Sequence, residues 1–299
     1  MSEKDWWQCN IKIERNFEDL LIWKFTEIGI NSYAFNCDKT NQNSIQAVVW
    51  LPKYYWNKSK RDKFENELSE FINKNGYQPR KFIWDQIKEA NWLNNWKKYW
   101  KPELIGNDFL VLPYWMEVNK KYQTRKVIKI NPGAAFGTGG HPSTALCIES
   151  MENTFLNDKK VLDIGCGSGI LSIAAKKLGA KEIYSIDNDY LAINATKENI
   201  EINFVSYHNF HISEGSFPSI IKNLELTNFD FICCNIIANV IKGIIPHLYH
   251  CLNSKGIILL SGILSSQESE IIKLLNLYHF KADNVLSKQD WISIKASKL

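Results

Sequence analysis

Residues Val161-Leu162-Asp163-Ile164-Gly165-Cys166-Gly167-Ser168-Gly169 determine the architecture of this chain more than any other segment. A short apolar run ends in glycines at every second position, and a helical pattern follows over residues 170–175. This order predicts a strand, a tight turn without Cβ atoms and the start of a helix. A second strand pattern over 182–186 ends in Asp187, where a nucleotide-binding unit places the acid that holds ribose hydroxyls. The segment therefore predicts a site for a molecule that carries a nucleoside.

The spacing of these glycines favours one kind of nucleoside ligand. A dinucleotide fingerprint has the pattern G-x-G-x-x-G, and its last glycine lets helix and strand pack closely beneath a pyrophosphate. Here Ile170 stands where that glycine is needed, and Asp163 at the mouth of the loop would repel a phosphate. A sulfonium with a nearby ammonium suits such a loop, so we expect S-adenosyl-L-methionine rather than NAD. A structural turn in an α/β protein is the alternative explanation for the glycines alone.

The composition is that of a soluble globular chain. Its 299 residues leave room for two domains, and 45% are hydrophobic and 23% charged. The sequence has no run of about 18 apolar residues that would predict a membrane span. Residues 1–7 have neither the basic nor the apolar region of a signal peptide. We therefore expect a cytoplasmic protein that acts without a membrane.

Cysteine and histidine spacing argues against a metal site. Seven cysteines without a C-x-x-C pair predict reduced, mostly buried thiols rather than disulfides or a zinc ribbon. The pairs His208/His211 and His247/His250 have H-x-x-H spacing. However, no cysteine or carboxylate accompanies them at ligand spacing, and the second pair lies on a predicted helix. We expect no metal.

Residues 1–88 predict a small first domain. Strand patterns occur at 6–13, 33–37, 44–51 and 81–87, and helical patterns at 16–28 and 58–75. The order β-α-β-β-α-β predicts an α+β ferredoxin-like sandwich. This fold hosts many functions and by itself indicates none.

Residues 89–130 predict a linker followed by short strands. Trp92, Trp96 and Trp100 recur at every fourth position and would share one helix face. Lysine and arginine outnumber aspartate and glutamate by 8 to 3 over 91–130, so the positive excess of the chain, whose net charge is +4, lies in this segment. Basic and aromatic residues that stack on nucleic-acid bases are one interpretation. We favour the other, a connecting helix fixed to one domain by its tryptophans.

Residues 131–299 predict a Rossmann-like α/β domain with a seven-stranded doubly wound sheet. The expected strands are 160–164, 182–187, 209–213, 229–235, 257–262, 283–288 and 291–296. The expected helices are 143–155, 169–178, 189–202, 238–252 and 266–278. We expect the last two strands to form an antiparallel hairpin at the sheet edge.

A glycine-rich segment leads into this domain's first helix, with the sequence Asn131-Pro132-Gly133-Ala134-Ala135-Phe136-Gly137-Thr138-Gly139-Gly140-His141-Pro142-Ser143-Thr144. Its glycines are typical of the hinges of a lid that folds over a cofactor. Together with 161–169, Asp187 and the string 235–239 (Asn-Ile-Ile-Ala-Asn), it resembles the class I methyltransferases that modify the eleventh protein of the large ribosomal subunit (the PrmA family). The resemblance covers 131–299 closely and the linker and first domain more loosely.

The resemblance implies transfer of methyl groups from S-adenosyl-L-methionine to lysine side chains of that ribosomal protein, with its N-terminal amine as a further candidate. It also implies that the first domain grips the substrate while the linker repositions it, and we expect a monomer without a direct nucleic-acid target. The positions that match the family's cofactor contacts are Thr144, Gly165, Asp187 and Asn235. Those that match its closing loop are Phe136, Gly137 and Thr138. We add Asp163 and Gly167 from the glycine loop itself.

Several of these residues have two possible roles. Asp187 can accept two hydrogen bonds from a ribose diol, or it is a solvated acid at a strand end. Thr144 contacts the ligand, caps a helix, or does both. Asp163 steers the ammonium of the cofactor or anchors the glycine loop. His141 is a general base or holds the lid shut.

Asn235 ends the fourth predicted strand of the α/β domain, at the edge where open α/β sheets bind ligands. Methyltransferases that act on planar amide or base nitrogens have Asn-Pro-Pro and an aromatic ring at this place, whereas residues 236–238 are Ile-Ile-Ala. An aliphatic amine has no π face and needs only to be neutral, so this string favours an amine acceptor. Two alternatives remain: methylation of another substrate such as rRNA or a glutamine amide, and a ribosome-binding module without catalysis.

Overall fold

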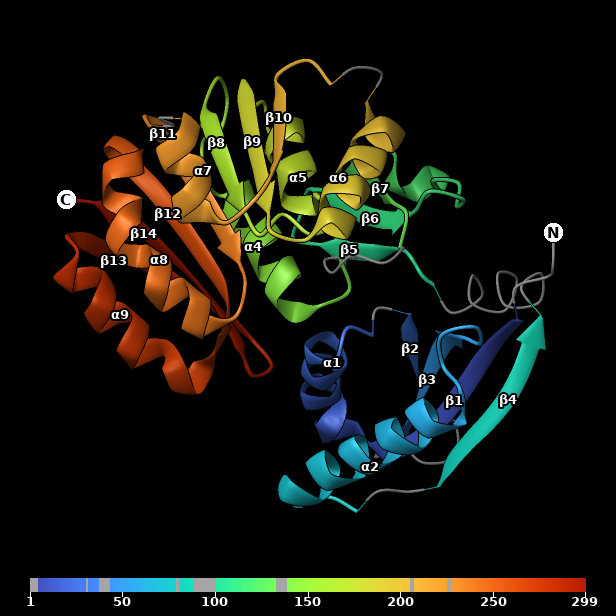
Figure 1. Cartoon of the computed structure of the whole chain (residues 1–299). Coiled ribbons are helices and arrows are strands. Elements are labelled where there is room, and N and C mark those ends of the chain that lie inside the picture. Colours follow the sequence, from blue (N-terminus) through green and yellow to red (C-terminus); the bar gives the residue numbers. More distant parts are fainter. Residues whose placement is uncertain are drawn as a thin grey trace. The chain divides into compact units, whose positions relative to one another are not determined.

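The computed structural model describes residues 5–30, 32–37, 44–78, 81–88, 100–132, 139–204, 207–224 and 227–299. The chain forms two compact units, Met1–Lys101 and Pro102–Leu299, each built on a sheet with packed helices (Figure 1). The expected lid residues Phe136, Gly137 and Thr138 and the linker residues Trp92 and Trp96 lie outside the described residues. Within the described ranges, no helix combines the length and apolar character needed to cross a membrane.

The first unit has the predicted order of elements. These are β1 (Asp5–Glu14), a 3-10 turn η1 (Arg15–Phe17), α1 (Glu18–Glu27), β2 (Tyr33–Cys37), β3 (Ser44–Pro52), α2 (Lys58–Lys74) and β4 (Phe82–Lys88). The sheet order is β2-β3-β1-β4, and every neighbouring pair is antiparallel. This order is that of the ferredoxin-like sandwich, so the predicted fold of the first unit is confirmed.

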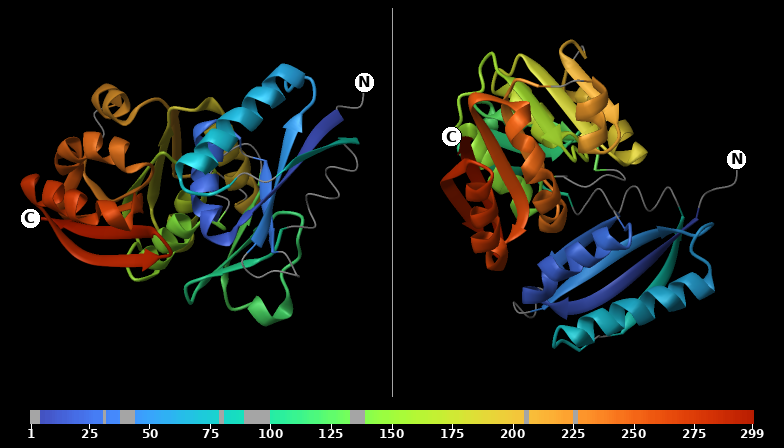
Figure 2. Two further views of the ribbon diagram at one scale, coloured as in Figure 1. Left: turned by 90° about the horizontal axis from the view of Figure 1, so that it is seen from below. Right: turned by 60° about the vertical axis from the view of Figure 1, so that its left-hand side comes forward.

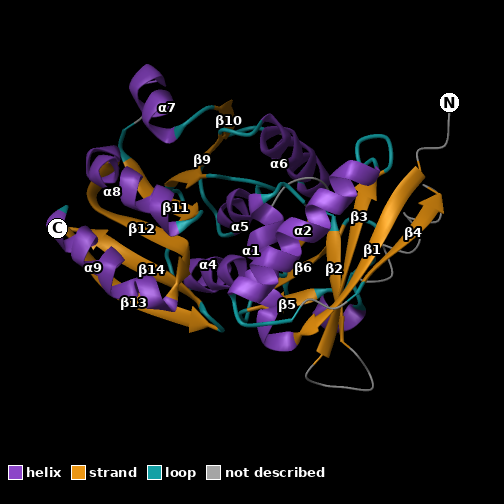
Figure 3. Cartoon of the chain, turned by 60° about the horizontal axis from the view of Figure 1, so that its bottom comes forward, coloured by secondary structure: helices purple, strands orange, loops and turns teal. Residues whose placement is uncertain are grey.

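The periodicities of the sequence build the core of this unit. In β1, Cys9 and every second residue after it face the helices, while in α2 the buried residues follow a spacing of four. Both helices therefore cover the same face of the sheet (Figure 3). The buried side chains of β1 and α2 are Cys9, Ile11, Ile13, Phe64, Leu68 and Ile72.

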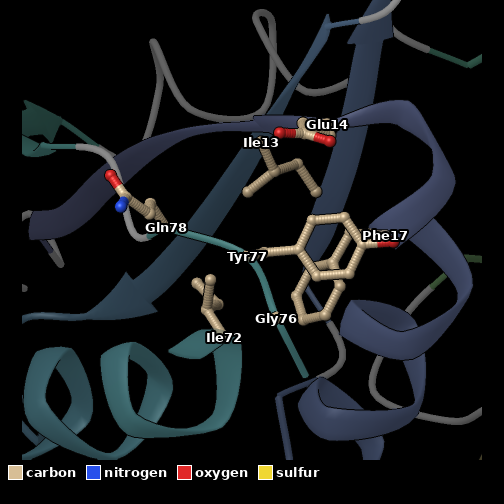
Figure 4. Close-up of a pocket in the computed structure, with 7 residues that line it drawn as sticks. All are labelled: Ile13, Glu14, Phe17, Ile72, Gly76, Tyr77 and Gln78. Carbon is tan, nitrogen blue, oxygen red and sulfur yellow. The ribbon is translucent and has the colours of Figure 1, made fainter. Parts of the chain in front are cut away.

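A cavity of about 300 Å³ opens on the first unit, where β1 ends near the last turn of α2 (Figure 4). Ile13 and Ile72 are buried in its floor, and Glu14 is exposed at its rim. The rings of Phe17 and Tyr77 lie side by side in its wall, with centroids 4.6 Å apart. No residue of the glycine loop lines this cavity.

The second unit contains two sheets. The smaller consists of β5 (Glu103–Ile105), β6 (Phe109–Pro113) and β7 (Lys126–Ile130), with a 3-10 turn η2 (Lys120–Tyr122). The remaining elements are α4 (Pro142–Glu152), β8 (Lys160–Ile164), α5 (Ile170–Lys177), β9 (Glu182–Asp187), α6 (Tyr190–Asn203), β10 (Phe210–Glu214), α7 (Phe217–Leu224), β11 (Phe229–Asn235), α8 (Ala238–Cys251), β12 (Leu252–Leu264), η3 (Ser265–Gln267), α9 (Glu268–Leu277), β13 (Phe280–Lys288) and β14 (Trp291–Lys298).

The large sheet has the order β10-β9-β8-β11-β12-β14-β13. Its first five strands run parallel, and β14 is antiparallel to both of its neighbours, which confirms the predicted doubly wound sheet with an antiparallel hairpin at its edge. Helices cover both faces (Figure 2). One apolar cluster joins the sheet to α7, α8 and α9, and a second joins it to α4, α5 and α6. The strand order reverses between β8 and β11, so the crevice at their carboxyl ends is the expected ligand site.

Three features differ from the sequence-based expectations. Helix α7 was not predicted from the sequence. Strand β12 begins at Leu252, directly after α8, rather than at 257. Residues 102–130 join the second unit instead of forming a separate linker segment, because side chains of β5–β7 are part of the same buried cluster as α4 and α5.

Candidate functional site

The glycine loop connects β8 to α5 at the carboxyl edge of the large sheet. Gly165, Gly167 and Gly169 have φ values of 71°, 55° and 77°, a region that side-chain-bearing residues rarely adopt. The N–H of Gly165 donates to the carbonyl of Ile186 in the next strand (2.8 Å). A Cβ on Gly165 would overlap the side chain of Ile236, and one on Gly169 would lie 2.9 Å from Thr196 Cγ2. Backbone conformation therefore favours glycine at all three positions, and close packing requires it at Gly165 and Gly169.

Asp187 lies at the end of β9, where its half-buried carboxylate holds two neighbouring loops. Its Oδ2 accepts the N–H of Gly167 (3.0 Å), and its Oδ1 accepts the N–H of Asp189 (3.0 Å). Each oxygen of a carboxylate can accept about two hydrogen bonds, so both retain capacity for a further donor. The structure thus brings together the glycine loop and the acid that the sequence placed one strand later.

Asp163 is buried beneath the first turns of α5, with only 1% of its surface exposed. Its Oδ2 accepts the N–H (3.0 Å) and the hydroxyl (2.6 Å) of Ser172, whose Oγ also lies 2.7 Å from Oγ of Ser185. Burial raises the pKa of Asp163 to about 6, although hydrogen bonds from Ser172 and Cys233 oppose the shift. Through Oδ2, Asp163 anchors the glycine loop and its helix, one of its two expected roles, whereas its Oδ1 is buried without a hydrogen-bond partner among the described residues.

The start of α4 corrects the expected role of Thr144 as a helix cap. The helix begins at Pro142 and its N-cap is His141, whose Nδ1 accepts the N–H of Ser143 (3.2 Å). Proline at the first helical position is the sequence signal that identifies this cap. Thr144, the next residue after Ser143, is fully buried, and its hydroxyl contacts the side chain of Asn235 instead of capping the helix.

That partner is Asn235, the last residue of β11. Its Nδ2 donates to Oγ1 of Thr144 over 3.2 Å. Its Oδ1 is buried and has no hydrogen-bond partner among the described residues. A buried acceptor without a partner costs about 1–3 kcal/mol, so such an atom is typical of a place where a ligand donates a hydrogen bond.

The segment after Asn235 is apolar and closely packed. Ile236 packs onto Gly165, and the side chain of Ile237 is 51% exposed. The path of the segment after Asn235 depends on Gly262. This glycine has a φ of 79°, and a Cβ on it would overlap the carbonyl of Ile236. The sequence offered no signal for this role of Gly262, because the two residues belong to different strand ends.

His141 lies in an environment that disfavours its charged form. Burial lowers the pKa of His141 to about 4, so the imidazole is neutral at physiological pH. Its ring packs edge-on against Trp291 of β14, with centroids 4.8 Å apart and planes at 67°. The structure places His141 next to the site, and its side chain contacts Ser143 and Trp291 of the protein itself.

Other candidate groups in the described residues do not gather into a site. The cysteines at 9, 147, 166, 233, 234 and 251 are free, and all six are buried as expected. His211 stacks on Tyr184 at 4.3 Å. No group of three or more His, Cys, Asp or Glu side chains with metal-binding geometry occurs in the part of the chain that the structure describes.

Comparisons with known proteins agree with this arrangement. The family model "Ribosomal protein L11 methyltransferase (PrmA)" matches residues 5–299. A ribosomal protein L11 methyltransferase of Prochlorococcus marinus (strain MIT 9301) is 49% identical over 298 residues, which cover 100% of this chain and 98% of the relative. Another, from strain MIT 9313 of the same species, is 32% identical over 98% of this chain and 97% of its own length.

A solved structure is also similar. The ribosomal protein L11 methylase of Lactobacillus delbrueckii subsp. bulgaricus has a TM-score of 0.60 and 29% sequence identity, covering 66% of this chain and 98% of that one. The full-length family match and the 49% identity settle the relationship. The chain belongs to the ribosomal protein L11 methyltransferase (PrmA) family.

Proposed function

We propose that this chain transfers methyl groups from S-adenosyl-L-methionine to amino groups of ribosomal protein L11. Lysine side chains are the principal acceptors, and the N-terminal amine is a further candidate. The observation that carries the proposal is the meeting of Asp187, the glycine loop and Asn235 at one sheet edge, in a chain that matches this family over residues 5–299. A ribosomal protein as substrate also favours a cytoplasmic location.

The residues at the sheet edge fit such a cofactor. The free acceptor capacity of Asp187 suits a ribose diol, and its charge strengthens both hydrogen bonds. Gly165 and Gly167 keep the loop free of side chains beside it. We assign to Asp163 the support of this loop. To Phe136, Gly137 and Thr138 we assign the lid that closes over the bound cofactor. When bound, the cofactor supplies an electrophilic methyl group on a positively charged sulfur.

Asn235 is proposed to hold the acceptor amine. Thr144 engages the amide N–H of Asn235, which leaves its Oδ1 as the atom that accepts a hydrogen bond from the amine. This hydrogen bond directs the lone pair of the nitrogen toward the methyl group, so that positioning of the amine accounts for most of the rate acceleration. The apolar side chains of Ile236 and Ile237 disfavour a charged ammonium, which has no lone pair and cannot attack.

We assign substrate binding to the first unit, and repositioning of the substrate to the linker.

A suitable experiment incubates the full chain with methyl-labelled cofactor and separated ribosomal components. We expect label in L11 and none in rRNA, and the Asp187→Ala variant serves as the negative control. Label in rRNA, or in glutamine residues of another protein, would contradict the proposed acceptor. Salt-dependent RNA binding without any transfer would favour a module that only binds ribosomes.

A further inference from the structure

We propose that His141 is a positioning residue rather than a general base. As the N-cap of α4 it fixes the first turn of the helix, and through this turn it fixes Thr144 against the amide of Asn235. The inference rests on the proposed function, because it concerns the same site.

The contacts of His141 organise the start of the helix. Its Nδ1 accepts the N–H of Ser143 (3.2 Å), and its carbonyl accepts those of Thr144 (3.1 Å) and Ala145 (3.1 Å). The N–H groups of Ser143 and Thr144 have no i−4 partner within the helix, whereas that of Ala145 makes the first ordinary helical bond. The side chain of His141 therefore holds the N–H of Ser143, and its backbone carbonyl, which any residue would provide, accepts the next two.

The hydrogen bond at Nδ1 determines which nitrogen carries the proton. Because Nδ1 accepts a backbone N–H, it is unprotonated, and the neutral ring carries its proton on Nε2. Oγ of Ser143, 2.7 Å away, is then a second donor to Nδ1. In this tautomer a general base would have to take up a proton at Nδ1 and lose the cap, so the two roles compete for one atom.

Three further contacts fix the cap to the rest of the unit. The ring of His141 packs on Trp291 of β14, which is only 7% exposed. Oγ of Ser261 in β12 lies 3.3 Å from the carbonyl oxygen of Ser143 and 2.8 Å from that of Ile292, and its one proton is shared between the two. Before the cap, Gly139 is buried so closely that a Cβ would lie 2.7 Å from Cγ1 of Val111. The first turn of α4 is thus held from three strands.

Loss of the cap would reach the site through the contact between Thr144 and Asn235. Thr144 lies three positions after the cap, in the turn that the cap holds, and its Oγ1 is 3.2 Å from Nδ2 of Asn235. A displacement of this turn by less than 1 Å would break that hydrogen bond, since such bonds weaken beyond about 3.2 Å. Loss of the cap is therefore expected to lower the rate through Asn235, without touching a reacting atom.

The experiment compares His141→Asn with His141→Ala in the full chain. Asparagine is a good N-cap but cannot accept a proton from an amine. We measure kcat and KM for methyl transfer to L11 over pH 6–9, together with the melting temperature. For H141A we expect kcat to fall about tenfold, with an unchanged pH profile, and the melting temperature to fall by about 3 °C. H141N is expected to restore the melting temperature and bring kcat to within about threefold of the wild-type value.

Two controls make the result specific. Asn119→Ala removes an ordinary cap in the second unit, from η2, where Oδ1 accepts the N–H of Lys121, and is expected to leave kcat unchanged. In a Thr144→Val background, H141A should lower kcat by less than twofold, because both substitutions act through one contact.

The proposal is overturned if kcat of H141N is as impaired as that of H141A, because a restored cap would then fail to restore the rate. It is also overturned if H141A keeps the wild-type kcat, whatever its melting temperature. A wild-type enzyme that methylates nothing would refute the proposed function instead. The melting temperatures of the two variants would then still test the cap.

Discussion

The side-chain amide of Asn235 donates from Nδ2 to Oγ1 of Thr144 across 3.2 Å, which joins the end of β11 to the first turn of α4. This hydrogen bond orients the amide, so that its buried Oδ1 is the free acceptor. Two elements on different sides of the glycine loop thus cooperate in presenting one oxygen atom. The proposed binding of an amine at this sheet edge depends on this orientation.

Thr144→Val tests that orientation. The substitution keeps the volume but removes the hydroxyl, so Nδ2 of Asn235 loses its acceptor and the amide can rotate. We expect kcat to fall about tenfold or more, corresponding to about 1.4 kcal/mol or more, with little change in cofactor affinity. The matched control is Thr154→Val at the other end of α4, where Oγ1 donates to the carbonyl of Ser150. Equal rates for the two variants would contradict the role of Thr144.

Asp187→Ala tests the acid at the end of β9. Loss of its charge-assisted hydrogen bonds is expected to weaken cofactor binding by about thirtyfold or more, or about 2 kcal/mol, measured by calorimetry. Asp230→Ala is a suitable control, because that carboxylate also accepts a backbone N–H, from Lys160, but lies near the start of β11. Wild-type affinity in Asp187→Ala would count decisively against the proposed site.

The raised pKa of Asp163 predicts a pH dependence of stability. Its folded value of about 6 lies above its ordinary value of 3.8, because burial disfavours the carboxylate. The native state therefore binds the proton more tightly than the unfolded state. The associated stability is fully present below pH 4 and is lost as the pH rises through 6, a change of about 3 kcal/mol.

Asp163→Asn removes this titration and provides the comparison. Urea unfolding at several pH values should show the wild type losing stability relative to the variant between pH 4 and pH 7. A constant difference between the two proteins over this range would show that Asp163 does not titrate with a raised pKa.

Gly262→Ala tests the close approach to Ile236. The new Cβ would overlap the Ile236 carbonyl at a φ of 79°, and we expect a loss of about 3 kcal/mol in the free energy of unfolding. The rate should fall as well, because Ile236 follows Asn235 directly. Gly243→Ala, within α8 and with no atom within 4 Å of the new Cβ, should instead stabilise by about 0.5–1 kcal/mol. Similar effects of the two substitutions would refute the packing argument.

Much of the fold was predictable because hydrophobic periodicity determines it locally. The strand of 160–164 and the acid at 187 follow from short apolar runs with clear ends, and both were predicted at their observed positions. Helix α7 was missed, whereas α5, also eight residues long, was predicted because the glycine loop marks its start. The membership of 102–130 in the second unit also escaped, since it depends on packing against α4 and α5 rather than on any local pattern.

The site was predictable only in part, because its decisive contacts join distant residues. Thr144 and Asn235 are 91 positions apart, and no periodicity links them. The buried contacts of Asp163 with Ser172 and Ser185 likewise arise from the stacking of β8, α5 and β9. The cap by His141 was also missed, because the helix was predicted to begin one residue late and Thr144 was offered as the cap, although proline at position 142 marks the true start.

Peptide mapping by mass spectrometry would identify the acceptor nitrogen itself, in purified ribosomal protein L11 incubated with the full chain and S-adenosyl-L-methionine. We expect methyl groups on amine nitrogens, lysine side chains foremost, and none when Asp187→Ala replaces the wild type. Unmodified L11, or methyl groups on amide nitrogens, would contradict the proposed amine methylation.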